Sequence, residues 1–96
     1  MLGGGRRWTG TLVIAYVQVT GRPTRVGFVC GRRVGRAVVR NRGRRLLKEA
    51  WRSLSPRIRE GFDLVLVARP EIRGAQLQDV REDLAETLAA GEVMDA

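Results

Sequence analysis

Apolar and β-branched side chains predominate between residues 11 and 19, and their order is typical of a β-strand. Side chains alternate between the two faces of a strand, so this segment has two different faces. One face is purely aliphatic and is expected to point into the core: Val13, Ala15, Val17 and Val19. The other face consists of Leu12, Ile14, Tyr16 and Gln18.

Two further strands are predicted, one on each side of a long helical segment. Residues 25–30 follow a turn at residues 21–24, so we expect them to form a hairpin with the first strand. Residues 62–68 are almost continuously apolar, which is typical of a strand that is covered on both faces and paired in parallel. Together with the intervening helix, the second and third strands are predicted to form a βαβ unit.

The segment between these strands has the period of an amphipathic helix, predicted over residues 36–53 and ended by Pro56. Its apolar side chains fall in one sector, which we expect to be buried: Val39, Gly43, Leu46, Leu47, Ala50 and Leu54. The opposite sector holds cations and one amide: Asn41, Arg44, Arg45, Lys48 and Arg52. Arg40 and Arg42 lie on the two flanks. Gly43 costs a helix roughly 1 kcal/mol relative to alanine, and a close approach of another element would explain it.

The two ends of the chain differ in composition. Residues 1–10 are rich in glycine, and we expect them to form a mobile lead-in. Near the other end, apolar residues at helical spacing predict a helix that stops near Gly91: Leu77, Val80, Leu84 and Leu88. The other face of that helix is acidic: Asp79, Glu82, Asp83 and Glu86. These carboxylates are either ligands for Mg²⁺ or a solvated helix face.

Charge is distributed unevenly along the 96 residues, which we expect to fold as one domain with a net charge of +8. Residues 22–59 hold 13 Arg or Lys side chains against one acid, whereas residues 60–96 hold nine acids against three arginines. Like charges four residues apart on a helix repel one another, and Arg40, Arg44 and Lys48 have this spacing. A polyanion would relieve the repulsion, so we expect the helix to bind RNA; the alternative is a solvated basic face.

The residue types that the chain lacks exclude most catalytic sites that a protein builds by itself. There is no histidine and only one cysteine, Cys30, which excludes a zinc site, a histidine-dependent nucleophile and an internal disulfide. Cys30 lies in an apolar run and is expected to be a small core residue. The longest hydrophobic stretch, residues 12–19, is too short to cross a bilayer, and we expect a cytoplasmic protein.

Two further features have a binding interpretation and a structural one. The loop at residues 31–36, GRRVGR, precedes a helix as phosphate-binding loops do, but it lacks the Gly-Lys-Ser/Thr ending of a nucleotide-binding loop. It is either a site for a backbone phosphate, with Arg32 and Arg33, or an ordinary turn. Tyr16 either stacks on an unpaired base or packs beneath a helix.

One long segment closely resembles the signature of a known family, the bacterial ribonuclease P protein component: Gly27 to Arg52, GFVCGRRVGRAVVRNRGRRLLKEAWR. In that family a basic loop and a Val-Gly pair precede a helix with the motif Arg-Asn-x-x-(Lys/Arg)-Arg-x-x-(Arg/Lys). Five residues fill this motif in register: Arg40, Asn41, Arg44, Arg45 and Lys48. The resemblance extends over about residues 5–90 and includes the strand that ends at Arg69-Pro70.

The resemblance implies an α+β fold: a small α/β sandwich with a central mixed sheet, a left-handed βαβ crossover against the general right-handed rule, and a C-terminal amphipathic helix. Proteins of the family assist a catalytic RNA that removes the 5′ leader from precursor tRNA. The RNA subunit holds Mg²⁺ and performs the hydrolysis, so no catalytic or metal-binding residue is expected in this chain. The implied partners are one ribonuclease P RNA and precursor tRNA, and neither DNA nor a membrane.

The resemblance also implies the role of individual residues. By position, the RNA contacts would be Arg32, Arg33, Arg40, Asn41, Arg42, Arg44, Arg45, Lys48 and Arg52. The cleft for the single-stranded leader would run along the sheet and include Ile14 and Tyr16.

The chain departs from the family pattern in two places. Family members have an N-terminal helix, with an aromatic residue that lines the leader cleft, before the basic stretch that Gly5-Arg6-Arg7 resembles. We expect either that the translation start has been placed too far downstream or that the protein lacks part of its leader site. The second departure is Gly43, where the family usually has an aliphatic residue.

Two other functions fit the same charge pattern. A ribosomal or RNA-chaperone protein would use a basic α/β surface to brace folded RNA, and a cleavage assay with the catalytic RNA distinguishes it. A DNA-binding module would place residues 36–52 in the major groove, but it needs a preceding helix or a dimer partner. The strand predicted before Gly31 argues against the DNA-binding interpretation.

Overall fold

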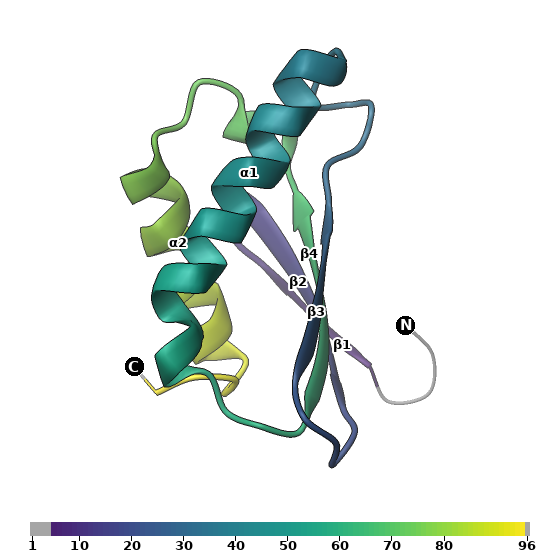
Figure 1. The fold of residues 1–96 in the computed structure, drawn as a ribbon, viewed down its shortest axis with the longest axis vertical. Coiled ribbons are helices and arrows are strands. Elements are labelled where there is room, and N and C mark those ends of the chain that lie inside the picture. Colours follow the sequence, from purple (N-terminus) through teal and green to yellow (C-terminus); the bar gives the residue numbers. More distant parts are fainter. Residues whose placement is uncertain (1–4, 96) are drawn as a thin grey trace.

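The computed structural model describes residues 5–95, which form a four-stranded sheet covered on one face by two helices (Figure 1). The strands are β1 (Arg6–Thr9), β2 (Val13–Val19), β3 (Arg25–Val29) and β4 (Phe62–Ala68). The helices are α1 (Ala37–Leu54) and α2 (Leu77–Ala90), and short 3₁₀ turns span Ser55–Arg57 and Pro70–Ile72. Within the described residues, neither helix is long and apolar enough to cross a membrane.

Strand β4 lies between β2 and β3, in the order β1-β2-β4-β3. It pairs antiparallel with β2 and parallel with β3, which confirms the mixed sheet and the βαβ unit. The predicted hairpin of β2 with β3 is wrong, because the most continuously apolar strand takes the place between them. In Figure 1 the chain rises through β3, descends through α1 and rises again through β4 behind β3, which is the left-handed sense that the resemblance implies.

The core lies between the sheet and the two helices. The sheet contributes alternate residues of β2 and β4: Val13, Ala15, Val17, Leu64, Leu66 and Ala68. The helices contribute residues at helical spacing: Leu47, Ala50, Leu54, Val80, Leu84 and Leu88. Most of the predicted apolar positions are buried, but Val39 and Leu46 of α1 are only half-buried and Leu77 of α2 is 40% exposed. Val19, another residue of the predicted core face, is 75% exposed because it is the last residue of β2, where the chain turns away.

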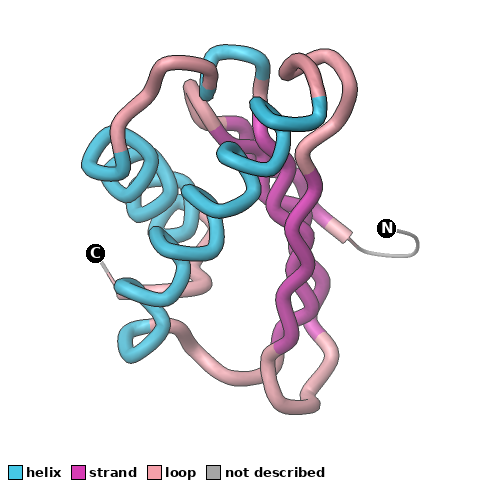
Figure 2. Tube along the Cα trace, turned by 45° about the horizontal axis from the view of Figure 1, so that its top comes forward, coloured by secondary structure: helices cyan, strands magenta, loops and turns pink. Residues whose placement is uncertain are grey.

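The second face of the sheet has no helix over it in the described part of the chain, and Figure 2 shows both helices on the same side of the strands. The prediction that residues 62–68 are covered on both faces is therefore wrong. Leu64, Leu66 and Ala68 are buried, whereas Asp63, Val65 and Val67 are only half-buried. We call the face that carries the half-buried residues the open face.

The segment before β2 is held in place by strand pairing and by the packing of one tryptophan. Residues 6–9, predicted as part of a mobile lead-in, form strand β1 and pair antiparallel with β2. The indole of Trp8 lies against Gly91 so closely that an added Cβ there would stand 2.9 Å from the ring. The prediction was wrong because the glycine-rich composition hid an anchoring tryptophan; residues 1–4 lie outside the described part of the chain.

Candidate nucleic-acid interface

The basic face of α1 points away from the core because the opposite side of the helix is buried. Gly43, Leu47, Ala50 and Leu54 pack inward, and α1 begins and ends within one residue of its predicted limits. Most of the predicted RNA contacts on the helix are exposed: Asn41, Arg42, Arg45, Lys48 and Arg52. Arg40 and Arg44, on the flank of the helix, are half-buried. The structure thus brings the predicted contacts of α1 onto one surface.

The cations of α1 have few partners within the protein. None of the ion pairs found among residues 5–95 includes a cation of α1. Arg44 donates from Nη1 to Oδ1 of Asn41 at 3.1 Å, which holds the two side chains together. Arg42 donates from Nη2 to the carbonyl oxygen of Ala75 at 2.8 Å and ties α1 to the segment before α2. The remaining guanidinium and ammonium donors are available to an anionic partner.

Helix α1 lies unusually close to the end of β3. A Cβ added at Gly43 would stand 2.8 Å from Sγ of Cys30 and 3.5 Å from Cγ2 of Ile72, which confirms the expected close approach. Burial raises the pKa of the Cys30 thiol, although the nearby charges of Arg44 and Arg40 oppose the rise. Cys30 is therefore a core residue, and two cations of α1 lie close to it.

The loop between β3 and α1 presents two of the predicted RNA contacts. Val34 is buried and anchors the loop, and its N–H donates to the carbonyl oxygen of Gly31 at 3.1 Å. Arg32 and Arg33 are the two central residues of this turn, and both are exposed. They line a pocket of about 370 Å³ at the edge of the open face, together with Ile14, Val29, Val67 and Arg69 among others.

The open face is apolar in its middle. Strand register places Ile14 beside Val67 and Tyr16 beside Val65, and Val67 in turn lies beside Val29. Arg7 of β1 is the partner of Tyr16 on the other side. The two predicted leader-cleft residues therefore share one surface with the pocket that Arg32 and Arg33 line. Sequence patterns missed Val29, Val65, Val67 and Arg7, because strand order decides which residues flank Tyr16.

An ion pair closes the end of the open face farthest from the pocket. Arg25 donates from Nε and Nη2 to the two carboxylate oxygens of Asp63, at 3.0 and 2.8 Å. This hydrogen bonding holds the pKa of Asp63 below its ordinary value and raises that of Arg25. Gln18 lies beside Asp63 in the register, so a polar row follows the apolar middle.

The acidic face of α2 is largely occupied by contacts within the protein. Asp83 accepts hydrogen bonds from three consecutive backbone N–H groups, those of Thr11, Leu12 and Val13, at 2.9, 2.9 and 3.0 Å. Asp79 accepts one from the backbone N–H of Gln76 at the start of the helix. Among residues 5–95 no group of three or more His, Cys, Asp or Glu side chains is arranged to hold a metal ion.

These features define a small α+β protein with a basic helix and an apolar, partly open sheet face joined by a basic loop, a combination typical of RNA-binding proteins. Comparison with known proteins supplies the family. Residues 2–91 match the family model Ribonuclease P, and the chain belongs to the family of bacterial ribonuclease P protein components. Membership makes it a protein component of a ribonucleoprotein endoribonuclease and a partner of that enzyme's RNA.

Individual relatives support the assignment. The ribonuclease P protein component of Symbiobacterium thermophilum is 42% identical over 84 residues, which are 85% of this chain and 73% of the relative. That of Chloroflexus aurantiacus is 43% identical over 86 residues, and the match spans 88% of this chain but 64% of the relative. The chain thus spans a little under two thirds of the Chloroflexus protein.

Solved structures of the family have the same fold. The ribonuclease P protein of Staphylococcus aureus superimposes with a TM-score of 0.83 at 19% identity, over 95% of this chain and 84% of that one. The protein from Thermotoga maritima gives a TM-score of 0.80 at 26% identity, over 90% of this chain and 83% of the other. These likenesses confirm the mixed four-stranded sheet with two helices.

Proposed function

We propose that this chain is the RNA-binding subunit that assists a catalytic RNA in removing the 5′ leader from precursor tRNA. The observation that carries the proposal is the face of α1, where cations four residues apart have no acidic partner among the described residues. Like charges in this arrangement are stabilised when phosphates approach and counterions leave. Family membership identifies the RNA of ribonuclease P as the source of those phosphates.

The division of labour within the enzyme is part of the proposal. The sequence contains no histidine and a single buried cysteine, so the usual protein-borne acid, base and nucleophile combinations are absent from it. In the proposed enzyme the RNA subunit performs the hydrolysis and holds the Mg²⁺ that the reaction needs. The protein binds and positions RNA, with one protein for one catalytic RNA.

The open face is the proposed path of the single-stranded leader. Ile14 and Tyr16 supply an apolar floor with one aromatic ring, on which an unpaired base can stack. Arg32 and Arg33 line the pocket at its edge, and in this proposal they contact RNA phosphates there. This arrangement favours binding of single-stranded RNA over duplex DNA, because stacking requires bases that are not paired.

The salt dependence of RNA binding tests the role of α1. For the wild-type protein and ribonuclease P RNA, the slope of log affinity against log salt counts the phosphates that the protein neutralises. Arg44→Ala and Lys48→Ala should each weaken binding and flatten the slope by about one unit. Arg81→Ala, which removes an exposed cation from α2, serves as the matched control. Unchanged slopes in both α1 variants would remove the helix from the interface.

A cleavage assay tests the function itself. The protein is mixed with a bacterial ribonuclease P RNA and 5′-labelled precursor tRNA at low Mg²⁺, where the RNA alone is nearly inactive. We expect cleavage at the mature 5′ end to be restored. Tight RNA binding without cleavage would favour a ribosomal or chaperone role, and a preference for duplex DNA would favour a DNA-binding module.

A further inference from the structure

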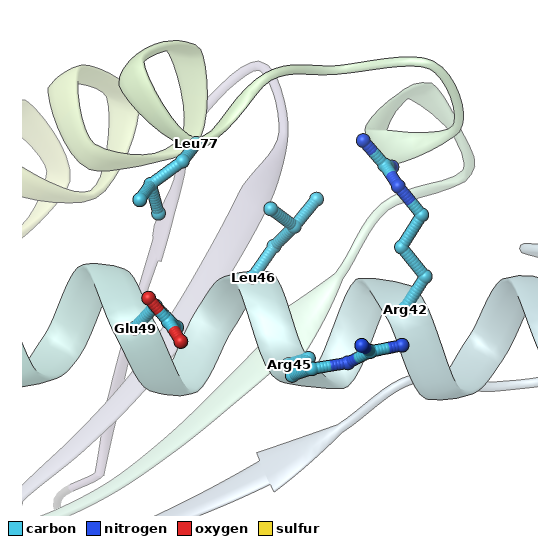
Figure 3. A pocket seen from close by; sticks show the side chains of 5 residues that line it. All are labelled: Arg42, Arg45, Leu46, Glu49 and Leu77. Carbon is cyan, nitrogen blue, oxygen red and sulfur yellow. The ribbon is translucent and has the colours of Figure 1, made fainter.

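A groove of about 280 Å³ runs between α1 and the start of α2, beside the basic face of α1 (Figure 3). Its lining combines two leucines, two arginines and one glutamate: Leu46, Leu77, Arg42, Arg45 and Glu49. Leu46 is half-buried and Leu77 remains 40% exposed although it is the first residue of α2. The groove therefore has an apolar floor that the fold does not cover.

The charged groups of this groove lie at different places around the leucines. Figure 3 shows Glu49 on the side of Leu77, whereas Arg42 reaches past Leu46 toward the segment before α2. The hydrogen bond from Nη2 of Arg42 to Ala75 fixes that guanidinium and leaves its other N–H groups free to donate. The groove thus offers a carboxylate acceptor, guanidinium donors and an apolar floor between them.

Glu49 is the only acid between residues 22 and 59, and it makes no ion pair among residues 5–95. Arg45 and Arg52 lie one helical turn away on each side, where a neutralising pair is favourable. A carboxylate left free on a helix that binds RNA repels phosphate. Glu49 is exposed, so its carboxylate oxygens can accept hydrogen bonds from a donor that enters the groove.

We propose that this groove binds one unpaired guanine of the ribonuclease P RNA, an inference that rests on the proposed function. The two adjacent donors of guanine, N1–H and N2–H, match the two oxygens of the Glu49 carboxylate. Its O6 and N7 acceptors, on the neighbouring Hoogsteen edge, match guanidinium donors of Arg42 and Arg45. The ring face packs against Leu46 and Leu77. Adenine and uracil each present an acceptor where guanine presents one of these donors.

Short RNA oligonucleotides test the base preference directly. Fluorescence anisotropy compares labelled UUGUU with UUAUU and with the inosine analogue, which lacks the N2 amino group. The wild-type protein should bind UUGUU about tenfold more tightly than UUAUU, and inosine should fall between them. Glu49→Gln should abolish the difference. If Glu49 acts only as a negative charge, Glu49→Gln will bind all three more tightly by the same factor, and the proposal fails.

Chemical footprinting tests the same contact in the assembled ribonucleoprotein. Kethoxal modifies N1 and N2 of unpaired guanines, the atoms assigned to Glu49. The wild-type protein should protect at least one guanine of the RNA that becomes reactive again with Glu49→Gln, while protection elsewhere is retained. Glu86→Gln, an exposed acid on α2, makes the same change of charge outside the groove.

The outcomes of the footprint separate this inference from the proposed function. Identical guanine protection by wild type and Glu49→Gln, with the rest of the footprint present, overturns the guanine assignment alone. Absence of any footprint with the wild-type protein overturns the RNA-binding function on which the assignment depends. Leu77→Ala, which removes part of the apolar floor, should weaken protection of the same guanine and of no other.

Discussion

At position 43 the fold requires a residue without a side chain, at some cost to the helix. Alanine should improve the helix propensity by about 1 kcal/mol, but its Cβ would stand 2.8 Å from Sγ of Cys30. Overlap of this kind costs about 1–3 kcal/mol, so Gly43→Ala should leave the free energy of unfolding unchanged or lower it. In a Cys30→Ala background the same substitution should stabilise by about 1 kcal/mol. Urea unfolding of the wild type, the two single variants and the double variant measures the coupling between positions 43 and 30. If Gly43→Ala changes the free energy of unfolding equally in both backgrounds, the steric overlap with Cys30 is refuted.

The Arg25–Asp63 pair contributes to the free energy of unfolding, and this contribution depends on pH. Its hydrogen bonds lower the pKa of Asp63 in the folded protein, so the pair stabilises the fold above the ordinary carboxyl pKa of about 3.9. That stability is lost as the pH falls through the lowered value. Because both side chains are solvent-accessible, the effect should be small. Asp63→Asn should melt below wild type at pH 7, with the gap closing below about pH 4; an equal gap at pH 3 would count against the pair.

At the scale of elements, Asp83 fastens the N-terminal strand to α2. Its carboxylate accepts three backbone hydrogen bonds from the turn between β1 and β2. Asp83→Ala should leave those N–H groups without a partner and lower the free energy of unfolding by about 2–3 kcal/mol. Hydrogen exchange of the β1 amides should rise as well. Glu82→Ala is the control, because Glu82 only accepts a bond from the exposed amide of Gln78; an equal loss of stability there would contradict the role of Asp83.

The sequence predicted the limits of individual elements far better than it predicted which elements lie side by side. The limits of β4, α1 and α2 follow from periodicity and from helix-ending residues, which are local properties. Strand order is not local, because any half-apolar strand fits beside any other, and the hairpin prediction failed for this reason. The contacts of Asp83 were equally hidden, since its partners are backbone groups about 70 residues away along the chain. The basic face of α1 was predicted almost completely, because one helix carries it.

At the scale of the whole molecule, two surfaces meet at the loop of residues 31–36. The loop continues into α1 on one side, and its arginines line the pocket that begins the open face on the other. In the proposed function, two different parts of one RNA complex would bind at the same time. Cations on α1 would hold the catalytic RNA, and the sheet would hold the leader. Substitutions on the two surfaces should then have different signatures.

A series of leader lengths separates the two surfaces. For the assembled enzyme, precursor tRNA with a leader of about five nucleotides should bind more tightly than mature tRNA, and stacking on Tyr16 should supply about 1–3 kcal/mol of that difference. Tyr16→Ala should therefore reduce the affinity for the long leader and leave mature tRNA unaffected, whereas Lys48→Ala should weaken assembly with the catalytic RNA whatever the leader. The affinity of the assembled enzyme for each tRNA, measured with the protein and RNA subunits at saturating concentration, distinguishes a loss of leader binding from a loss of assembly. If Tyr16→Ala weakens both tRNAs equally, the open face does not read the leader, and the ring serves to pack the sheet.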